Sequence, residues 1–356
     1  MTAYDAVLVV SFGGPEGPAD VIPFLENVTR GRSIPPERLA EAGRHYDLFG
    51  GVSPINGQNR NLVAAIEHEL GASGLDLPVY WGNRNWHPLL ADTVAGMAAA
   101  GVGRALAFVT SAFGSYSGCR QYLDDIEGAR AEVGPTAPVI DKIRLFFDHP
   151  GFIGPWVTNV AAAFDLVPPA RRPQARLVFT AHSIPMAMAA AAPYEDQLRQ
   201  ACGLIAGRLP GRPPWDLAYQ SRSGAPGQPW LEPDIADALR AAAAGGAADV
   251  VVAPVGFVSD HMEVVYDLEV QARQVAVDLG LHMVRAATPG LALAPMVAAL
   301  VAERMTERPS VTERPSVTER MTAPVTGAGA ARPALGTMGP WPDHCPAGHC
   351  LPARLS

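Results

Sequence analysis

The sequence is poor in lysine, in cysteine and in charge, and each shortage excludes a class of protein. Its 356 residues include one lysine, Lys142, and only 17% of them are charged. The formal net charge of −8 argues against nucleic acid as the partner, because nucleic-acid-binding surfaces are basic. The four cysteines are too few and too scattered for the disulfide framework of a small secreted protein.

Long apolar runs are missing as well. No stretch approaches the ~20 residues that a membrane-spanning helix needs. The opening residues, MTAYDAVLVVSFGGPEG, lack the basic start of a secretory signal. Hydrophobic residues nevertheless make up 48%, which suits a globular chain with a substantial core. We therefore expect a cytoplasmic protein with no membrane-spanning segment.

Short apolar runs recur along most of the chain, and turn residues separate them. Continuous runs of this kind are typical of strands that are covered on both faces. Helical patterns such as those at 57–70 and 194–209 alternate with the runs, and this alternation predicts parallel sheets with crossover helices. The fold class is thus α/β, with two doubly wound, Rossmann-like domains and the site at the carboxyl ends of the strands. The predicted strands are at 5–13, 78–84, 104–113, 175–183, 216–222 and 249–257.

Composition divides the chain into four parts. We predict an N-terminal α/β domain at 1–137 and a second at 138–302, with the chain crossing between them near 138–150. The repeat TERPSV and the Gly, Ala and Pro residues after it predict a flexible, low-complexity linker at 303–340. The tail, 341–356, contains two cysteines, which suggests that it docks back onto the body.

The stretch PVGFVSDHMEVVYDLE, residues 254–269, gathers acidic residues in a chain that has few charges. A helix that begins near Asp260 would place Asp260, Glu263 and Asp267 on one face, where like charges repel. Capping and the helix dipole account for Asp260 and Glu263. They leave Asp267 and Glu269 unexplained, and a passing metal cation would make the row tolerable.

A histidine ends one of the predicted strands. In LVFTAHSIPM, 177–186, His182 lies at the carboxyl end of the strand, where open α/β sheets build their active sites. A single histidine there is more often structural than catalytic. The strand before Glu263 ends similarly, so His182 and Glu263 could face each other across one cleft. Imidazole and carboxylate together suit a divalent metal such as Fe²⁺ and provide a base near neutral pH.

Two glycine-containing segments are less specific. In FGGVSPINGQNR, 49–60, Ser53 or Asn56 could cap a helix. In TSAFGSYSGCRQYLDDI, 110–126, a loop precedes a helix and could hold an anionic group. Neither contains GxGxxG or GxxxxGK[ST], so neither specifies a nucleotide.

In chain order, these segments resemble the ferrochelatases, the enzymes that insert Fe²⁺ into a porphyrin. The resemblance covers most of residues 4–300, and the pairing of AHS-P with the later SDH-E is its most specific part. It is closest to the actinobacterial type, whose substrate is coproporphyrin III. The motifs that carry it are VLVVSFGGP, GGVSPINGQ, GNRNWHP, SAFGSYSGC, FTAHSIPM, YQSRSGAPGQPWLEP and VGFVSDHMEVVYDLE.

The resemblance implies a set of functional residues. It assigns His182 and Glu263 to metal insertion, with His182 as proton acceptor and first contact of the metal. It places Ser53 and Tyr122 against the porphyrin, at its propionates. It also implies that Asp267 continues an acidic route by which Fe²⁺ is delivered.

Two further residues are expected at the porphyrin. Phe12 stands where some relatives have a tyrosine that caps the metal, so no oxygen ligand is available at this position. The phenyl ring would instead form an apolar wall of the cleft. Arg30 could pair with carboxylates of the substrate.

The cysteines supply only part of the ligand set of a cofactor that some members of the family hold. Several ferrochelatases hold a [2Fe–2S] cluster with one mid-chain cysteine and three near the C-terminus. Cys119 matches the first position, and the tail supplies only Cys345 and Cys350. Histidine replaces cysteine on some clusters, whereas a zinc site or free thiols are alternatives. The candidates for a fourth ligand are Cys202, His344 and His349.

Several functions compete with coproporphyrin III metallation. The ring could be protoporphyrin IX, or the metal could be cobalt or nickel. A zinc metallohydrolase around His182, His261 and Glu263 would need a third close ligand, and HExxH is absent. A carrier of tetrapyrrole or metal on the same fold would need no proton acceptor.

Overall fold

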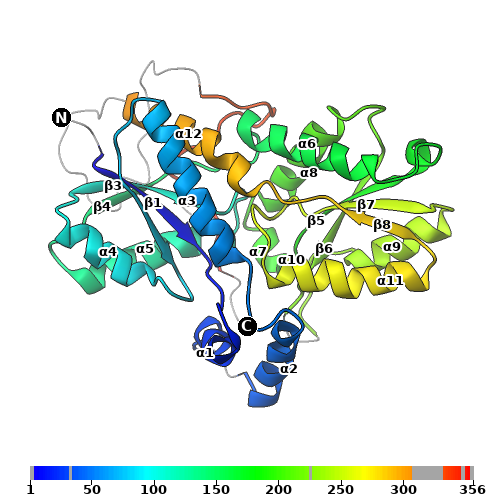
Figure 1. Cartoon of the computed structure of the whole chain (residues 1–356), viewed down its shortest axis with the longest axis horizontal. Helices are drawn as coiled ribbons and strands as arrows, with labels where there is room; N and C mark the ends of the chain where they lie inside the picture. The colour runs from blue at the N-terminus through cyan, green and yellow to red at the C-terminus, as the bar shows by residue number, and fades with distance from the viewer. Residues whose placement is uncertain (1–3, 32–33, 224–226, 307–331, 346–348, 353–356) are drawn as a thin grey trace.

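In a computed structural model, the described residues are 4–31, 34–223, 227–306, 332–345 and 349–352. Within them lie two parallel four-stranded sheets, side by side and covered by helices (Figure 1). The predicted α/β class with two doubly wound sheets is confirmed. Most of the predicted linker, 307–331, lies outside the described residues.

The first sheet has the strand order β2-β1-β3-β4. Its central strand alternates between two cores: Ala6, Leu8 and Val10 pack with α4 and α5, whereas Val7 and Val9 face the core on the other side. Both faces are therefore buried, as the continuous apolar run predicts. The elements are β1 (Ala6–Ser11), α3 (Ile55–Ala72), β2 (Val79–Asn83), α4 (Leu90–Ala99), β3 (Arg104–Val109), the π-helix η1 (Tyr116–Arg120), α5 (Gln121–Val133) and β4 (Val139–Lys142).

The second sheet repeats this topology with the order β6-β5-β7-β8. Its strands are β5 (Arg176–His182), β6 (Trp215–Gln220), β7 (Asp249–Ala253) and β8 (His282–Arg285). The helices around it are α6 (Pro150–Asp165), η2 (Arg172–Gln174), α7 (Met186–Ala189), α8 (Tyr194–Ala206), α9 (Ile235–Ala244), α10 (Met262–Tyr266), the π-helix η3 (Asp267–Ala272), α11 (Arg273–Asp278), η4 (Gly290–Leu293) and α12 (Ala294–Thr306).

The pattern of apolar runs missed β4 and β8. Each has four residues, lies at a sheet edge and carries charged or polar residues, so neither forms a long apolar run. β4 lies within the segment expected to cross between the halves, yet it pairs with β3, so the first sheet extends past residue 137. α12 also returns to pack on α3. The division at 137–138 stays a prediction.

A small lobe stands apart from the sheets and consists of α1 (Pro18–Val28) and α2 (Pro36–Asp47) (Figure 1). Phe24 is its centre and packs edge-on against Phe12, Tyr46 and Trp86, with ring centroids 6.1–6.3 Å apart. The lobe touches the second half of the chain through His45, whose ring stacks on Tyr266 at 3.8 Å. The lobe is therefore in contact with α10 of the second half.

The described part of the tail lies on the body, as expected. A buried ion pair between Arg144 and Glu303 lies at its base, with an N–O distance of 2.8 Å, and Arg144 also donates to the Pro333 carbonyl at 3.0 Å. Trp341 packs edge-on against Phe147 at 6.3 Å. The tail thus joins the core of the molecule.

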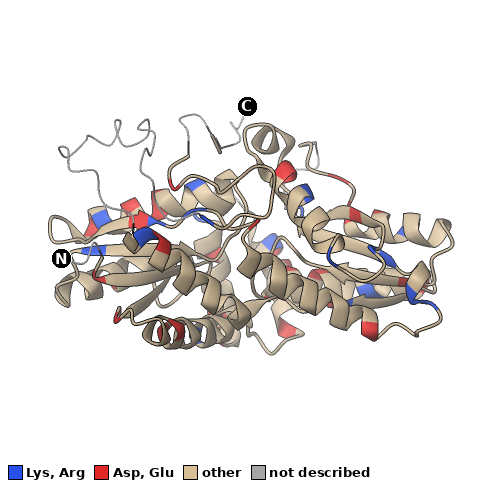
Figure 2. Ribbon diagram, turned by 90° about the horizontal axis from the view of Figure 1, so that it is seen from above, with Lys and Arg blue, Asp and Glu red and all other residues tan. Residues whose placement is uncertain are grey.

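The ribbon reflects the low charge of the sequence. Seen from above, acidic and basic residues are scattered among uncharged ones (Figure 2). Among the described helices, none has the length and apolar character needed to cross a membrane.

Candidate active site

His182 is the last residue of β5, an inner strand of the second sheet. Its Nδ1 lies 2.5 Å from the Ser183 carbonyl oxygen, so Nδ1 carries a proton and Nε2 is left to face Glu263. Tyr194 donates its hydroxyl proton to the His182 carbonyl at 3.0 Å. These bonds fix the orientation of the ring at the carboxyl edge of the sheet.

Glu263 reaches the same place from the neighbouring strand. β7 pairs with β5, and the loop after β7 leads into α10, where His261 is the N-cap and its Nδ1 accepts from the Glu263 amide at 3.2 Å. Glu263 Oε1 lies 3.5 Å from His182 Nε2. The structure therefore joins the two residues that the sequence singles out.

The two groups change each other's ionisation. Burial opposes protonation of His182, but the Glu263 carboxylate outweighs it and raises the pKa of His182 to about 9. Burial also opposes ionisation of Glu263, and the two neighbouring histidines, His182 above all, bring its pKa down to about 2. At neutral pH the pair is imidazolium and carboxylate. Their side chains stay 31% and 47% exposed, so an incoming ligand can reach them.

Asp267 begins the π-helix η3, whose wider turn follows directly on α10. The Ser221 hydroxyl donates to its carboxylate at 2.5 Å. Burial raises the pKa of Asp267 to about 7, and the Glu263 carboxylate adds to the rise while the Ser221 bond opposes it. Asp267 thus lies within electrostatic range of the pair.

The rest of the predicted acidic row is elsewhere. α10 begins at Met262, so Asp260 precedes the helix and the prediction of a shared face with Glu263 is wrong. Arg285, at the end of β8, pairs with Asp260 at 3.1 Å and with Glu269 at 2.6 Å. Arg285 therefore neutralises Asp260, and Arg285 and Arg273 together neutralise Glu269. Glu263 and Asp267 remain as the acids beside His182.

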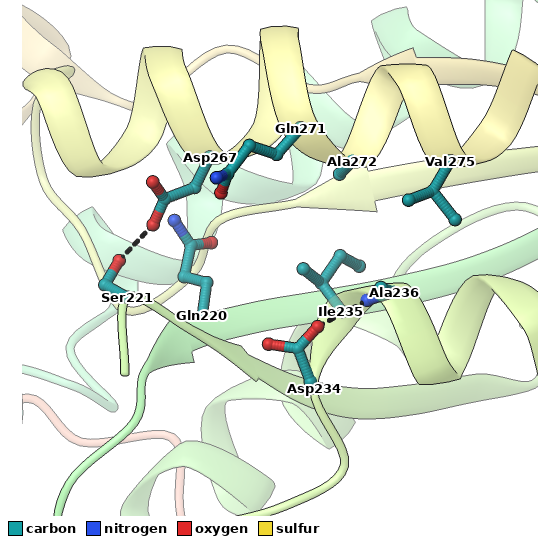
Figure 3. A pocket seen from close by; sticks show the side chains of 9 residues that line it. All are labelled: Gln220, Ser221, Asp234, Ile235, Ala236, Asp267, Gln271, Ala272 and Val275. Carbon is teal, nitrogen blue, oxygen red and sulfur yellow. Dashed lines mark hydrogen bonds between the residues drawn. The ribbon is translucent and has the colours of Figure 1, made fainter. Parts of the chain in front are cut away.

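A pocket of about 240 Å³ opens beside Asp267 (Figure 3). Its polar wall comes from the end of β6, the start of α9 and the π-helix. The side-chain amide of Gln220 donates through Nε2 to the Glu263 backbone carbonyl. The side-chain oxygen of Gln220, Oε1, is buried and has no hydrogen-bond partner among the described residues. The lining residues are Gln220, Ser221, Asp234, Ile235, Ala236, Asp267, Gln271, Ala272 and Val275.

The expected porphyrin contacts lie on the first half of the chain. Tyr122, on α5, and Ser53, just before α3, are both buried. The guanidinium of Arg84 lies over the rings of Tyr122 and Phe12, at 4.8 and 5.8 Å from their centroids. Arg30 is exposed just beyond α1.

Arg84 is the residue that the sequence reasoning missed most clearly. It follows β2 directly, is 9% exposed and pairs with Asp125 at 2.9 Å. Its position after a strand, in the motif GNRNWHP, was the available signal. Arg84 connects the two aromatic walls, Phe12 and Tyr122.

Three tyrosines, Tyr46, Tyr122 and Tyr194, lie within electrostatic range of Glu263. Tyr46 and Tyr194 were not expected from the sequence. Burial raises the pKa values of Tyr46, Tyr122 and Tyr194, and the Glu263 carboxylate contributes to each rise. Tyr46 belongs to the lobe, Tyr122 to the first half and Tyr194 to the second. The surroundings of Glu263 therefore include residues from all three parts of the molecule.

The comparisons with known proteins identify the family. A family model described as ferrochelatase matches residues 4–307. The chain belongs to the ferrochelatase family. A ferrochelatase of Rhodopirellula baltica is 49% identical over 98% of this chain and 93% of its own length. The coproporphyrin III ferrochelatase of Nocardia farcinica is 54% identical over 86% of this chain and 88% of its own.

Further similarity extends to the tail and to the fold. The coproporphyrin III ferrochelatase of Frankia alni is 50% identical over 99% of this chain and 88% of its own length. The solved structure of SirB from Bacillus subtilis with Fe³⁺ superimposes with a TM-score of 0.50 at 10% identity, covering 84% of this chain and 94% of SirB. At that identity the likeness concerns the fold alone.

Three of the four cysteines, Cys119, Cys345 and Cys350, lie close together. Contact with Cys345 and burial raise the pKa of Cys119, whereas contact with Cys345 lowers the pKa of Cys350, so Cys345 lies between the other two. The one lysine, Lys142, is buried beside Cys119. Cys202 is buried on α8. Yet among the described residues no group of His, Cys, Asp and Glu has an arrangement that would hold a metal.

Proposed function

We propose that this ferrochelatase inserts Fe²⁺ into coproporphyrin III and produces Fe-coproporphyrin III for haem synthesis. The pair of His182 and Glu263, 3.5 Å apart in the cleft, carries the proposal. The choice of ring is supported by the names of the relatives from Nocardia farcinica and Frankia alni. The Rhodopirellula baltica relative is named only ferrochelatase, so protoporphyrin IX is the rival substrate.

The chemistry requires two protons to leave the pyrrole nitrogens for each Fe²⁺ that enters. His182 as imidazolium cannot accept a proton, because its pKa is held near 9 by Glu263. Fe²⁺ that binds the Glu263 carboxylate withdraws this support, so His182 releases its proton to water. The neutral Nε2 then accepts the first pyrrole proton, releases it to water and accepts the second as the metal enters the ring.

The ring must also tilt its nitrogens out of plane before the metal can enter. Phe12 and Tyr122, connected through Arg84, would form the walls against which the macrocycle is bent. The strain is supplied by the binding energy of the rest of the ring. Ser53 and Arg30 would contact its propionates.

Fe²⁺ would reach the pair by way of Asp267. With a pKa of about 7, this carboxyl is partly ionised at neutral pH and exchanges a proton for a cation readily. The pocket in Figure 3 would give the ion a hydrated approach. Glu263 and Asp267, the two acids beside His182, would then form a two-step route.

The test is an anaerobic insertion assay with Fe²⁺ and either coproporphyrin III or protoporphyrin IX. Faster metallation of coproporphyrin III, abolished in His182→Ala and retained in the control His68→Ala, supports the proposal; His68 is exposed on α3. Equal rates for the wild type and His182→Ala would favour a carrier. Parallel reactions with Co²⁺ and Ni²⁺ test the other chelatase alternatives. Cell fractionation tests the cytoplasmic location.

We further propose that Cys119, Cys345 and Cys350 are thiolate ligands of a [2Fe–2S] cluster. Their convergence from distant parts of the sequence supports this, whereas the incomplete ligand set stands against it, since such clusters take four ligands. His344 and His349 are exposed, so neither completes the set as placed. No step of the insertion depends on the cluster. Iron and sulfide analysis with the visible spectrum of the anaerobic protein tests it, with Cys119→Ser as the variant and Cys202→Ser as a test of the fourth ligand.

A further inference from the structure

Ser221 has an unusual backbone conformation directly after β6. Its φ is +63°, in the left-handed region that side chains other than glycine, Asn and Asp seldom occupy. Such a conformation persists only where the surroundings fix it, and it often occurs at functional sites. The conformation turns the chain away from the sheet immediately after Gln220.

In this conformation, the side chain of Ser221 contacts Asp267. Its hydroxyl donates to Asp267 Oδ2 at 2.5 Å, the dashed contact on the left of Figure 3. The preceding residue, Gln220, donates to the Glu263 backbone carbonyl. Gln220, the last residue of β6, therefore holds the backbone of Glu263 in α10, and Ser221, directly after it, holds the carboxylate of Asp267 in the π-helix.

The register of the sheet also fixes the position of His182 relative to Gln220 and Ser221. His182 and Gln220 are paired residues of β5 and β6, and the Ser183 amide donates to the Gln220 carbonyl at 2.8 Å. Because the sheet fixes this register, Ser221 has a set place relative to the His182 ring. The end of β6 thus contacts or pairs with all three residues, His182, Glu263 and Asp267.

We propose that Ser221 is a positioning residue that holds the Asp267 carboxylate on the Fe²⁺ route. The inference rests on the proposed function, because it assigns Ser221 a role in metal uptake and none in porphyrin binding. A charge-assisted hydrogen bond fixes the carboxylate more firmly than a neutral one would. Without it, the Asp267 carboxylate loses the contact that fixes its orientation.

The experiment separates the hydroxyl from the backbone. Ser221→Gly accepts the left-handed conformation and removes the donor, whereas Ser221→Asn tolerates that conformation and restores an N–H donor. We expect KM for Fe²⁺ to rise about tenfold in Ser221→Gly, the loss that one hydrogen bond to a charged group implies, with KM for the porphyrin unchanged. Ser221→Asn should return KM for Fe²⁺ to within about twofold of the wild type.

The controls identify a purely structural role. Ser73→Gly makes the same chemical change at an exposed residue after α3 and should alter neither constant. An unchanged KM for Fe²⁺ in Ser221→Gly, an equal rise of both KM values, or an asparagine variant as poor as the glycine variant would overturn the inference. Failure of the proposed function is distinct, because it would appear as no insertion by the wild type or as full activity of His182→Ala.

Discussion

At the scale of single residues, the ionisation of each group in the site depends on the charge of its neighbours. His182 and Glu263 are each recognisable in the sequence, but their ionisation is a property of the pair. The same applies to Arg84, whose charge lies between two aromatic rings and an aspartate. Two predictions follow from these mutual effects.

The first concerns the pKa of His182. Glu263→Gln removes the carboxylate and leaves the burial, so the pKa of His182 should fall well below its value of about 9, although the Ser183 carbonyl and Asp267 still raise it. Since the folded-state pKa is the raised one, the pair stabilises the wild type fully below pH 6.5 and loses this effect as the pH rises through 9. An NMR titration of the imidazole measures the shift. An unchanged pKa in the variant would refute the role of Glu263.

The second concerns Arg84. Arg84→Met keeps an apolar side chain between Phe12 and Tyr122 but leaves the partly buried Asp125 without its arginine. We expect a loss of about 1–3 kcal/mol in the free energy of unfolding and a several-fold weaker porphyrin affinity. Denaturant titration and porphyrin fluorescence measure the two effects. Arg38→Met, at an exposed position on α2, is the control and should change neither.

At the scale of elements, the loop between β7 and α10 has little freedom. Gly256 in this loop donates its amide proton to the Thr180 carbonyl of β5. A Cβ on Gly256 would lie 2.6 Å from the Cβ of Ala181, the residue before His182. The close approach of loop and strand therefore sets the spacing between His182 and Glu263.

Gly256→Ala should disturb this spacing. The added methyl forces the loop and β5 apart, at an expected cost of about 1–3 kcal/mol in stability together with a large loss of insertion activity. Gly128→Ala is the matched control, because a Cβ there meets nothing within 4 Å on the exposed face of α5. That variant should gain up to about 1 kcal/mol from helix propensity. Thermal unfolding and the insertion assay compare the two, and equal effects would contradict the explanation.

At the scale of the whole molecule, the tail joins parts that are distant in sequence. The buried Asp343 accepts from Arg304 of α12 at 2.9 Å and from Arg332 at 2.5 Å. The amide of Cys350 donates to the Ala191 carbonyl at 2.8 Å, just beyond α7. The tail thus contacts the helix that packs on the first half and the loop that follows the strand of His182.

Asp343→Ala should weaken this docking. The variant removes the acceptor that two arginines share, and buried pairs of this kind cost about 3–5 kcal/mol when one partner is lost. The expected outcome is faster protease cleavage around residues 332–352, with the body up to α12 still resistant. Mass spectrometry of limited digests measures it. Asp76→Ala, at an exposed aspartate, should leave the digestion pattern as in the wild type.

The sequence by itself determined the fold class, six of the eight strands, and His182 with Glu263 as the central pair. These follow from local patterns: continuous apolar runs for buried strands, and polar residues where such strands end. The family motifs added Ser53, Tyr122, Phe12 and Asp267, whose roles stay predictions.

Only the tertiary structure decided which acids face the cleft and which are paired. Asp260 looks the same as Glu263 and Asp267 in the sequence, and Arg285, on an edge strand too short to predict, distinguishes it. Glu269 also pairs with Arg285, but its second partner, Arg273, lies only four residues further along the chain. The positions of Arg84, Tyr46 and Ser221 in the site also depend on contacts between residues far apart in the chain. Such contacts are set by the packing of two sheets and a lobe, which no local pattern of residues encodes.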